Sequence, residues 1–138
     1  DIFAKSHIKH LKNSKFKDLI NDEIISNIIF ISNNLNCEQI NDLYGISDCY
    51  VSPYLAEGFG LTPLEASSSG TPIVITKGGS TDDYFNEIMG EQISSKLVIN
   101  KNASYLRPNI DSLVESINLI INNRIPRLKI YIGATKKY

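Results

Sequence analysis

Residues 49–76 read CYVSPYLAEGFGLTPLEASSSGTPIVIT and contain the unit that decides the fold, a strand, a helix and a second strand. Short strand-forming runs lie at 49–53 and at 72–76, and a proline bounds each of them. The segment between them predicts a helix that continues through Ser69 and ends before Gly70, a residue type common just after helices. Two strands joined by a helix predict parallel neighbours in one sheet.

The same alternation continues on both sides of this unit. The further predicted elements are a helix at 6–19, a strand at 27–32, a helix at 37–46 with Asn36 as N-cap, a short helix at 81–90, a strand at 96–100 and a helix at 110–123 with Asp111 as N-cap. Residues 103–108 are predicted to be a loop, and the tail 124–138 receives no assignment. Alternating short apolar strands and helices predict an α/β fold, a Rossmann-like parallel sheet with helices on both faces, in a single domain over 1–138.

Composition excludes several classes of protein. The 138 residues are 42% hydrophobic and 21% charged with a net charge of −1, which is ordinary globular composition without the strong positive charge of a nucleic-acid binder. Cys37 and Cys49 match no zinc spacing and are expected to be reduced thiols, so we expect no metal and a cytoplasmic location. His7 and His10 are interpreted as surface residues without metal partners.

Lysines are concentrated in the first 20 residues, and two interpretations remain open for them. A solvated helix face is favoured, because surface charge needs no special explanation. A basic patch for phosphates or an anionic membrane is the alternative. The lysines concerned are Lys5, Lys9, Lys12, Lys15 and Lys17.

Three loops follow predicted strands and carry unusual chemistry. Their sequences are SNNLN (32–36), SPYLAEGFGLTP (52–63) and TKGGST (76–81). Ligands of parallel sheets bind outside the carboxyl ends of the strands. We therefore expect the three loops to converge on one edge of the sheet and to form a site there.

The nonapeptide EGFGLTPLE (57–65) supports two interpretations. In the first, Thr62 is the N-cap of the helix, Pro63 is its first residue, and Glu65 completes a capping box. In the second, glycines at 58 and 60 bring the backbone close to a ligand, and the helix N-terminus attracts a phosphate or diphosphate. Flanking carboxylates would then accept hydrogen bonds from sugar and ribose hydroxyls, which describes a nucleotide-sugar site.

The run YVSPYLAEGFGLTPLEASSSGTPIVITKGGSTDDYF (50–85) resembles the signature region of the retaining glycosyltransferases of family 4. The matching features are a Pro-Tyr pair, the paired-Glu motif EGFGLTPLEA, the GTPIV run and a Gly-Gly pair. Weaker similarity extends over about 28–123. The resemblance implies the two-domain GT-B fold, with this run in its C-terminal, donor-binding half.

The resemblance also implies roles for individual residues. Glu57 matches the first glutamate of the motif, which lies by the transferred sugar and serves catalysis. Glu65 matches the second, which binds the ribose hydroxyls. The segment expected against the donor sugar and diphosphate comprises Gly58, Phe59, Gly60, Leu61 and Thr62. Members of the family are usually metal-independent, so the expected co-substrate is a nucleoside-diphosphate sugar without a cofactor.

The chain also departs from the family pattern. No match exists for the family's Arg/Lys pair, and Leu55 stands where many relatives place a polar residue. The first strands of the half and the N-terminal acceptor-binding domain are missing, and the chain opens at Asp1, so we expect a piece that is inactive alone. Lys77 is either a local cation or an exposed loop lysine. The alternative functions are a non-catalytic binding or scaffold domain of the GT-B type and another GT-B enzyme, such as a phosphorylase or a nucleotide-sugar epimerase.

Overall fold

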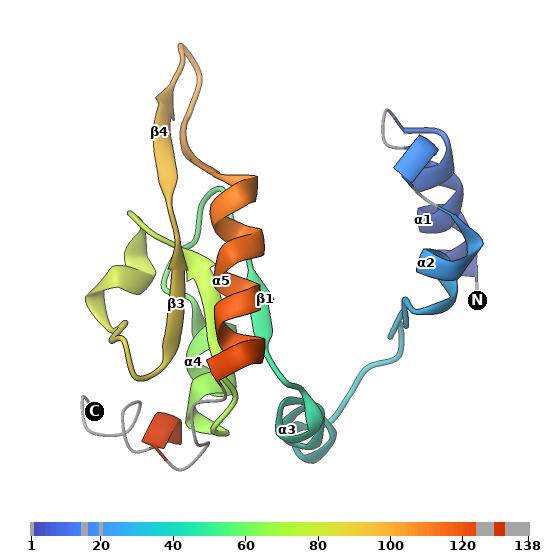
Figure 1. Ribbon diagram of the computed structural model, residues 1–138. Helices are drawn as coiled ribbons and strands as arrows, with labels where there is room; N and C mark the ends of the chain where they lie inside the picture. Colours follow the sequence, from blue (N-terminus) through green and yellow to red (C-terminus); the bar gives the residue numbers. More distant parts are fainter. Residues whose placement is uncertain (1, 15–16, 20, 124–128, 132–138) are drawn as a thin grey trace. The chain divides into compact units, whose positions relative to one another are not determined.

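The computed structural model describes residues 2–14, 17–19, 21–123 and 129–131, and it divides the chain into two compact units (Figure 1). The first unit is Asp1–Asn36 and the second is Cys37–Tyr138. The prediction of a single domain over 1–138 stays a prediction beside this division into two compact units.

The first unit is helical. Its elements are α1 (Ile2–Lys12), the 3₁₀ turn η1 (Lys17–Leu19) and α2 (Asp22–Ser26). The predicted helix at 6–19 is wrong in its bounds, because α1 ends just before an Asn-Ser pair, and these side chains compete with the helical backbone. The ammonium of Lys12 lies 3.0 Å from the carboxylate of Asp22, an exposed ion pair that contributes less than about 1 kcal/mol.

The predicted strand at 27–32 is also wrong. In the described structure this apolar run pairs with no strand, and the side chain of Ile29 is 86% exposed. An apolar run becomes a strand only where a neighbouring strand supplies hydrogen bonds and a core covers it.

The second unit contains the predicted parallel sheet. Its strands are β1 (Tyr50–Ser52), β2 (Ile73–Thr76) and β3 (Gly90–Ile93), in the order β1-β2-β3. Helix α3 (Cys37–Ile46) precedes β1, and α4 (Leu61–Ser68) connects β1 to β2 as predicted. The strand at 49–53 and the strand at 72–76 are therefore confirmed, with bounds shortened by one or two residues.

Strand β3 was missed, because the segment 81–90 was predicted to be a helix. Only the 3₁₀ turn η2 (Ser80–Asp83) forms there. The side chain of Asn86 then accepts a hydrogen bond from the amide of Ile88 at 3.0 Å, a turn geometry that ends helical winding. Gly90 opens β3 with φ +152°, where a Cβ atom would lie 1.9 Å from the carbonyl oxygen of Ile73.

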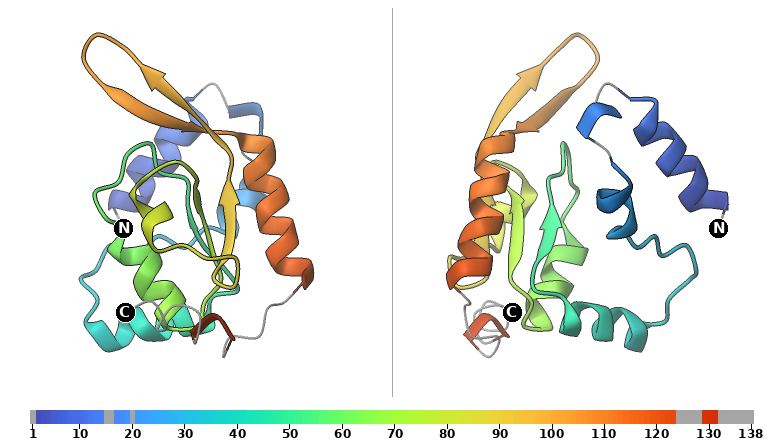
Figure 2. Two further views of the ribbon diagram at one scale, coloured as in Figure 1. Left: turned by 90° about the vertical axis from the view of Figure 1, so that its left-hand side faces the viewer. Right: turned by 45° about the vertical axis from the view of Figure 1, so that its right-hand side comes forward.

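The strand predicted at 96–100 forms as β4 (Ser95–Ile99), but outside the parallel sheet. Only Ser94 separates it from β3, and a parallel neighbour would require a long crossover connection. It pairs instead with β5 (Ser104–Pro108), in the segment predicted to be a loop, and forms an antiparallel hairpin (Figure 2).

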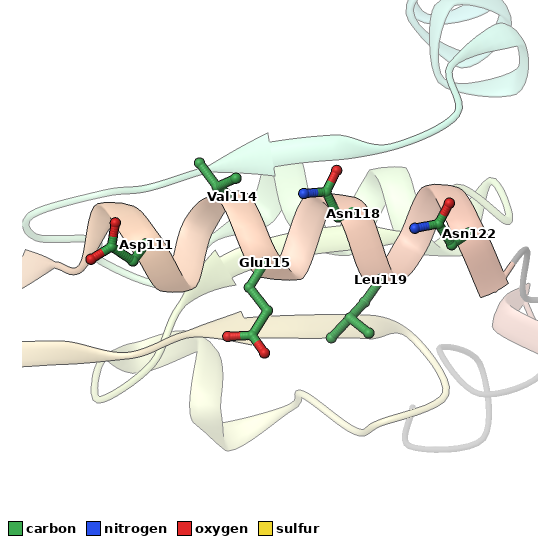
Figure 3. Close-up of a pocket in the computed structure, with 6 residues that line it drawn as sticks. All are labelled: Asp111, Val114, Glu115, Asn118, Leu119 and Asn122. Atoms are coloured by element: carbon green, nitrogen blue, oxygen red, sulfur yellow. The ribbon is translucent and has the colours of Figure 1, made fainter.

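Helix α5 (Ile110–Asn123) has the predicted bounds and covers one face of the sheet. Its N-cap is Asn109 rather than Asp111, because the Asn109 side chain accepts the amide hydrogen of Ser112 at 2.9 Å. Ile120 packs with Val74 of β2 and with Ile93 of β3. The outer side of the helix forms a shallow groove (Figure 3). Its lining residues are Asp111, Val114, Glu115, Asn118, Leu119 and Asn122.

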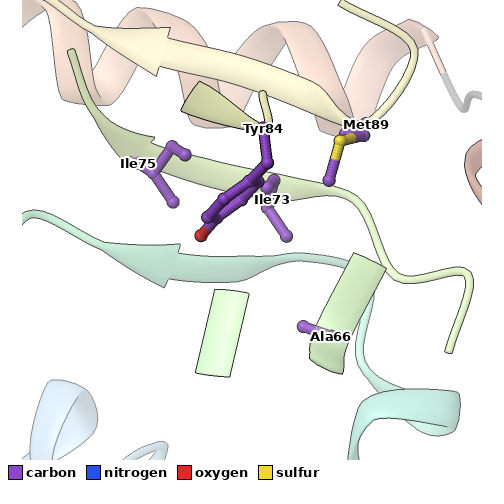
Figure 4. Packing of buried hydrophobic residues seen from close by; sticks show 5 residues of the cluster. All are labelled: Ala66, Ile73, Ile75, Tyr84 and Met89. Atoms are coloured by element: carbon purple, nitrogen blue, oxygen red, sulfur yellow. The ribbon is translucent and has the colours of Figure 1, made fainter. Parts of the chain in front are cut away.

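Helix α4 covers the opposite face. Side chains alternate across a strand, so Ile73 and Ile75 point away from the α5 side and meet Ala66 of α4. Tyr84 and Met89 complete this cluster (Figure 4). Full burial of each such aliphatic side chain contributes roughly 1.5–3 kcal/mol. The α/β class with helices on both faces of a parallel sheet is thus confirmed.

Candidate functional site

The loop that follows β1 is held by the segment that follows β2. The hydroxyl of Tyr54 donates to the carbonyl of Thr76 at 2.8 Å and lies 2.6 Å from the hydroxyl of Thr81. The hydroxyl of Thr76 donates back to the carbonyl of Tyr54 at 2.9 Å. Two of the three loops predicted to converge therefore do so at the carboxyl edge of the sheet. The third, at 32–36, belongs to the first unit.

The N-terminus of α4 begins at Gly60, with φ +84° and no side-chain cap. Tyr84, only 1% exposed, donates its hydroxyl to the carbonyl of Gly60 at 2.7 Å. The capping box predicted for this helix is wrong, because Leu61 is already the first helical residue. The hydroxyl of Thr62 instead shares a 2.8 Å hydrogen bond with the hydroxyl of Tyr50. Buried Pro63 has no amide hydrogen, so Leu61 and Thr62 carry the first amides of the helix.

Glu57 lies on the η2 side of this helix start. Its carboxylate is exposed and accepts the amide hydrogen of Gly58 at 2.9 Å. Its carbonyl accepts the hydroxyl of Ser80 at 3.1 Å, which attaches the loop to η2. A Cβ atom at Gly58 would meet nothing within 4 Å, so this glycine leaves open space beside the carboxylate.

Two apolar side chains border the same loop. The ring of Phe59 is 42% exposed and lies 5.5 Å from the ring of Tyr84, centroid to centroid. Leu61, the first residue of α4, is more exposed still. An exposed aromatic ring held by a buried one is a rigid surface on which the face of a sugar ring can pack.

Glu65 lies on the other side of α4, beside α3. Burial raises the pKa of the Tyr44 phenol, and the nearby carboxylate of Glu65 raises it further. These two residues border a pocket of about 380 Å³ between α3 and α4. The hydroxyl of Ser69 donates to the side chain of Asn41 at 2.9 Å on the pocket wall. Glu65 therefore lies beside Tyr44 of α3 and borders this pocket.

The loop after β2 is shaped by one carboxylate. Asp82 accepts the amide hydrogen of Gly78 at 2.9 Å and the side-chain amide of Gln92 at 2.7 Å. Exposed Lys77 lines a polar pocket of about 490 Å³ together with Glu87 and Glu91. The other charged residues that line this pocket are acidic, which favours the interpretation of Lys77 as an exposed loop lysine.

Sequence reasoning missed the residues that hold the loops together, because their partners lie far away along the chain. These residues are Tyr54, Thr76, Ser80, Thr81, Asp82, Tyr84 and Gln92. The Pro-Tyr pair quoted for the family resemblance was the one available signal for Tyr54.

Cys37 and Cys49 are free, and burial raises the pKa of the Cys49 thiol to about 11. Within the part of the chain that the structure describes, no group of three His, Cys, Asp or Glu side chains gathers as a metal site. Among the same residues, no helix has the length and apolar content needed to cross a bilayer.

The parallel sheet, with an uncapped helix beginning at its carboxyl edge, is consistent with one half of a GT-B-type glycosyltransferase. The profile of the family described as "Glycosyl transferases group 1" matches residues 10–137. The chain therefore belongs to the group 1 glycosyl transferases.

Two curated relatives match shorter stretches. The lipopolysaccharide core biosynthesis mannosyltransferase LpsB of Rhizobium meliloti (strain 1021) is 45% identical over 53 residues, which cover 38% of this chain. The MMP alpha-(1->4)-mannosyltransferase of Mycolicibacterium hassiacum is 37% identical over 68 residues, which cover 49% of this chain. These stretches span 14% and 16% of the respective relatives.

Proposed function

We propose that the chain is the donor-binding part of a retaining glycosyltransferase that transfers a hexosyl unit from a nucleoside-diphosphate sugar to an acceptor. The supporting observation is the uncapped N-terminus of α4, with Glu57 on its η2 side and Glu65 on its α3 side. Membership of the family and the mannosyltransferase names of both relatives support glycosyl transfer and make mannose the first sugar to test.

The diphosphate is assigned to the start of α4. The amides of Leu61 and Thr62 and the helix dipole favour an anion, and the positive φ of Gly60 sets the direction of the helix. When the bond between the anomeric carbon and the diphosphate oxygen breaks, negative charge grows on the leaving diphosphate. Fixed amide dipoles stabilise such charge without having to reorganise.

The two ends of the donor are assigned to the two glutamates. The hexose lies by Glu57 in the open space beside Gly58, with the face of Phe59 available for packing. The ribose lies by Glu65, whose carboxylate borders the pocket between α3 and α4. The donor thus crosses the N-terminus of α4, and Glu57 supports the charge that develops at the anomeric carbon.

Titration of the chain with GDP, UDP and ADP by calorimetry tests this assignment. We expect one of the three to bind, and Glu65→Ala to weaken that binding roughly ten- to a hundredfold through the loss of charge-assisted hydrogen bonds to the ribose. Glu115→Ala is the matched control, because it removes an equal charge from the outer groove of α5 and leaves α4 intact.

Two outcomes would count against the proposal. If no nucleotide binds at millimolar concentration, the donor site is not formed by these residues. If Glu65→Ala and Glu115→Ala bind equally well, Glu65 does not hold the ribose, and its contact with Tyr44 is its whole role.

A further inference from the structure

The hairpin of β4 and β5, residues 95–108, is a two-stranded sheet of its own that projects from the second unit (Figure 2). Its base is fastened to both loops of the candidate site. The amide of Leu106 donates to the carbonyl of Leu55 at 2.7 Å, and the hydroxyl of Ser95 donates to the carbonyl of Lys77 at 2.6 Å. The hairpin is thus attached to the site but takes no part in the parallel sheet.

The two faces of the hairpin differ in chemistry. Side chains directly opposite in an antiparallel pair share a face, so Lys96 and Arg107 lie on one face. The other face carries Leu97 and Ile99, which are 62% and 74% exposed. Lys101 lies in the connection between the strands. By the same register, Val98 and Tyr105 share the face of Lys96 and Arg107, so the hairpin has one mainly apolar face and one face that mixes cations with an apolar and an aromatic side chain.

No acidic residue compensates these charges within the hairpin sequence. Between Glu91 and Asp111 the chain contains three cations and no Asp or Glu, although its overall net charge is −1. Like charges directly opposite each other destabilise a strand pair, so Lys96 and Arg107 oppose the pairing that the backbone makes. An external anion would relieve this repulsion.

A binding partner of the hairpin must therefore provide both negative charge and an apolar environment. A nucleic-acid backbone offers the charge, but it leaves Leu97 and Ile99 in water. The interface of a bilayer with anionic lipids offers both, because headgroups attract basic side chains and the acyl boundary accepts apolar ones. We propose that the hairpin docks on an anionic membrane surface.

Docking at this position would bring the candidate site close to the bilayer, because Leu55 and Lys77 lie in its loops. The acceptor would then be a molecule presented at the membrane, such as a lipid-linked sugar. The docking itself does not rest on the proposed glycosyl transfer, since it follows from the chemistry of the hairpin alone.

Co-sedimentation with unilamellar vesicles tests the proposal. The complete chain is expected to bind vesicles of phosphatidylcholine with 40% phosphatidylglycerol more strongly than vesicles of pure phosphatidylcholine, and to lose binding as salt rises. The triple variant Lys96→Gln, Lys101→Gln, Arg107→Gln should bind the anionic vesicles about a hundredfold more weakly, at roughly fivefold for each basic residue. The variant Leu97→Ser, Ile99→Ser should also bind more weakly.

The lysines of α1 provide the matched control. Lys5→Gln with Lys9→Gln removes exposed cations from the other unit and should leave most of the vesicle binding intact. Circular dichroism confirms that each variant is folded, and nucleotide titration shows whether the donor site is unchanged.

Several results would overturn the proposal. The first is equal binding to both kinds of vesicle. The second is a loss of vesicle binding in the α1 variant but in neither hairpin variant. The third is binding to single-stranded RNA that is as strong as vesicle binding and is unchanged in the Leu97→Ser, Ile99→Ser variant. Self-association that the apolar variant abolishes, without any vesicle binding, would assign the apolar face to a second copy of the chain. A failure of nucleotide binding would leave the docking result standing and would count only against the proposed function.

Discussion

At the scale of the residue, Gly60 combines two restrictions. Its φ of +84° lies in the region that side chains rarely adopt, and a Cβ atom there would lie 2.6 Å from Cγ2 of Thr81 and 2.7 Å from the hydroxyl of Tyr84. Gly58, two residues earlier, has neither restriction. The two glycines look alike in the sequence motif, but only Gly60 is required by the backbone.

We predict that Gly60→Ala lowers the free energy of unfolding by about 1–3 kcal/mol, because it adds backbone strain and a clash with Thr81 and Tyr84. Gly58→Ala should change it by less than about 0.5 kcal/mol. Urea unfolding followed by circular dichroism measures both. Equal losses at the two positions would show that the helix start is not restricted as described.

At the scale of the element, packing of α5 on the sheet depends on which side of the helix a residue occupies. Ile120 is 3% exposed and packs with Val74 and Ile93, whereas its neighbour Ile121 is 54% exposed. Replacing either isoleucine by alanine therefore makes the same chemical change, once at a buried position and once at an exposed position of the same helical turn.

We predict that Ile120→Ala lowers the free energy of unfolding by about 2–4 kcal/mol, through lost burial and the cavity that remains. Ile121→Ala should stay within about 0.5 kcal/mol of the parent. Chemical denaturation of both variants provides the measurement. A large loss at Ile121 would mean that the outer face of α5 is covered in solution.

Elements with strong local signals were predictable from the sequence. The buried run Ile73–Thr76 and the helix Ile110–Asn123 were found because the first is a short continuous apolar run next to a proline and the second has apolar residues at helical spacing. Strand β3 was missed because GEQI contains a single β-branched residue, and its strand character comes from pairing with β2.

The candidate site was predictable only in part. The local motif predicted a helix start between Glu57 and Glu65, and a helix does begin there, although without the predicted cap. The position of the helix start was wrong because Thr62 looks like a cap, while its hydroxyl bonds to Tyr50 across the fold. The hydrogen bonds of Tyr54 and Tyr84 join residues more than twenty positions apart, which no local pattern encodes.

At the scale of the whole molecule, both hydrophobic clusters draw their described residues from the second unit. We predict that residues 37–138 alone keep a cooperative unfolding transition. A peptide of residues 1–36 should show little helix, because the eleven-residue α1 is shorter than the roughly 12–15 residues that isolated helices need in water. Circular dichroism and urea unfolding test both pieces. An unfolded 37–138 chain would show that its core needs the first unit.

The parallel pairing of β1 with β2 also has a kinetic consequence. Tyr50 meets Ile73 only after the whole of α4 has been placed between them, whereas β4 and β5 are joined by a short connection and can pair within about 1–10 μs. The hydrogen bond from the hydroxyl of Tyr84 to the carbonyl of Gly60 can form only after β2 is in place, because Tyr84 follows β2 in the chain. We therefore expect the hairpin to form early in folding and the loop that carries Glu57 to take its final shape late.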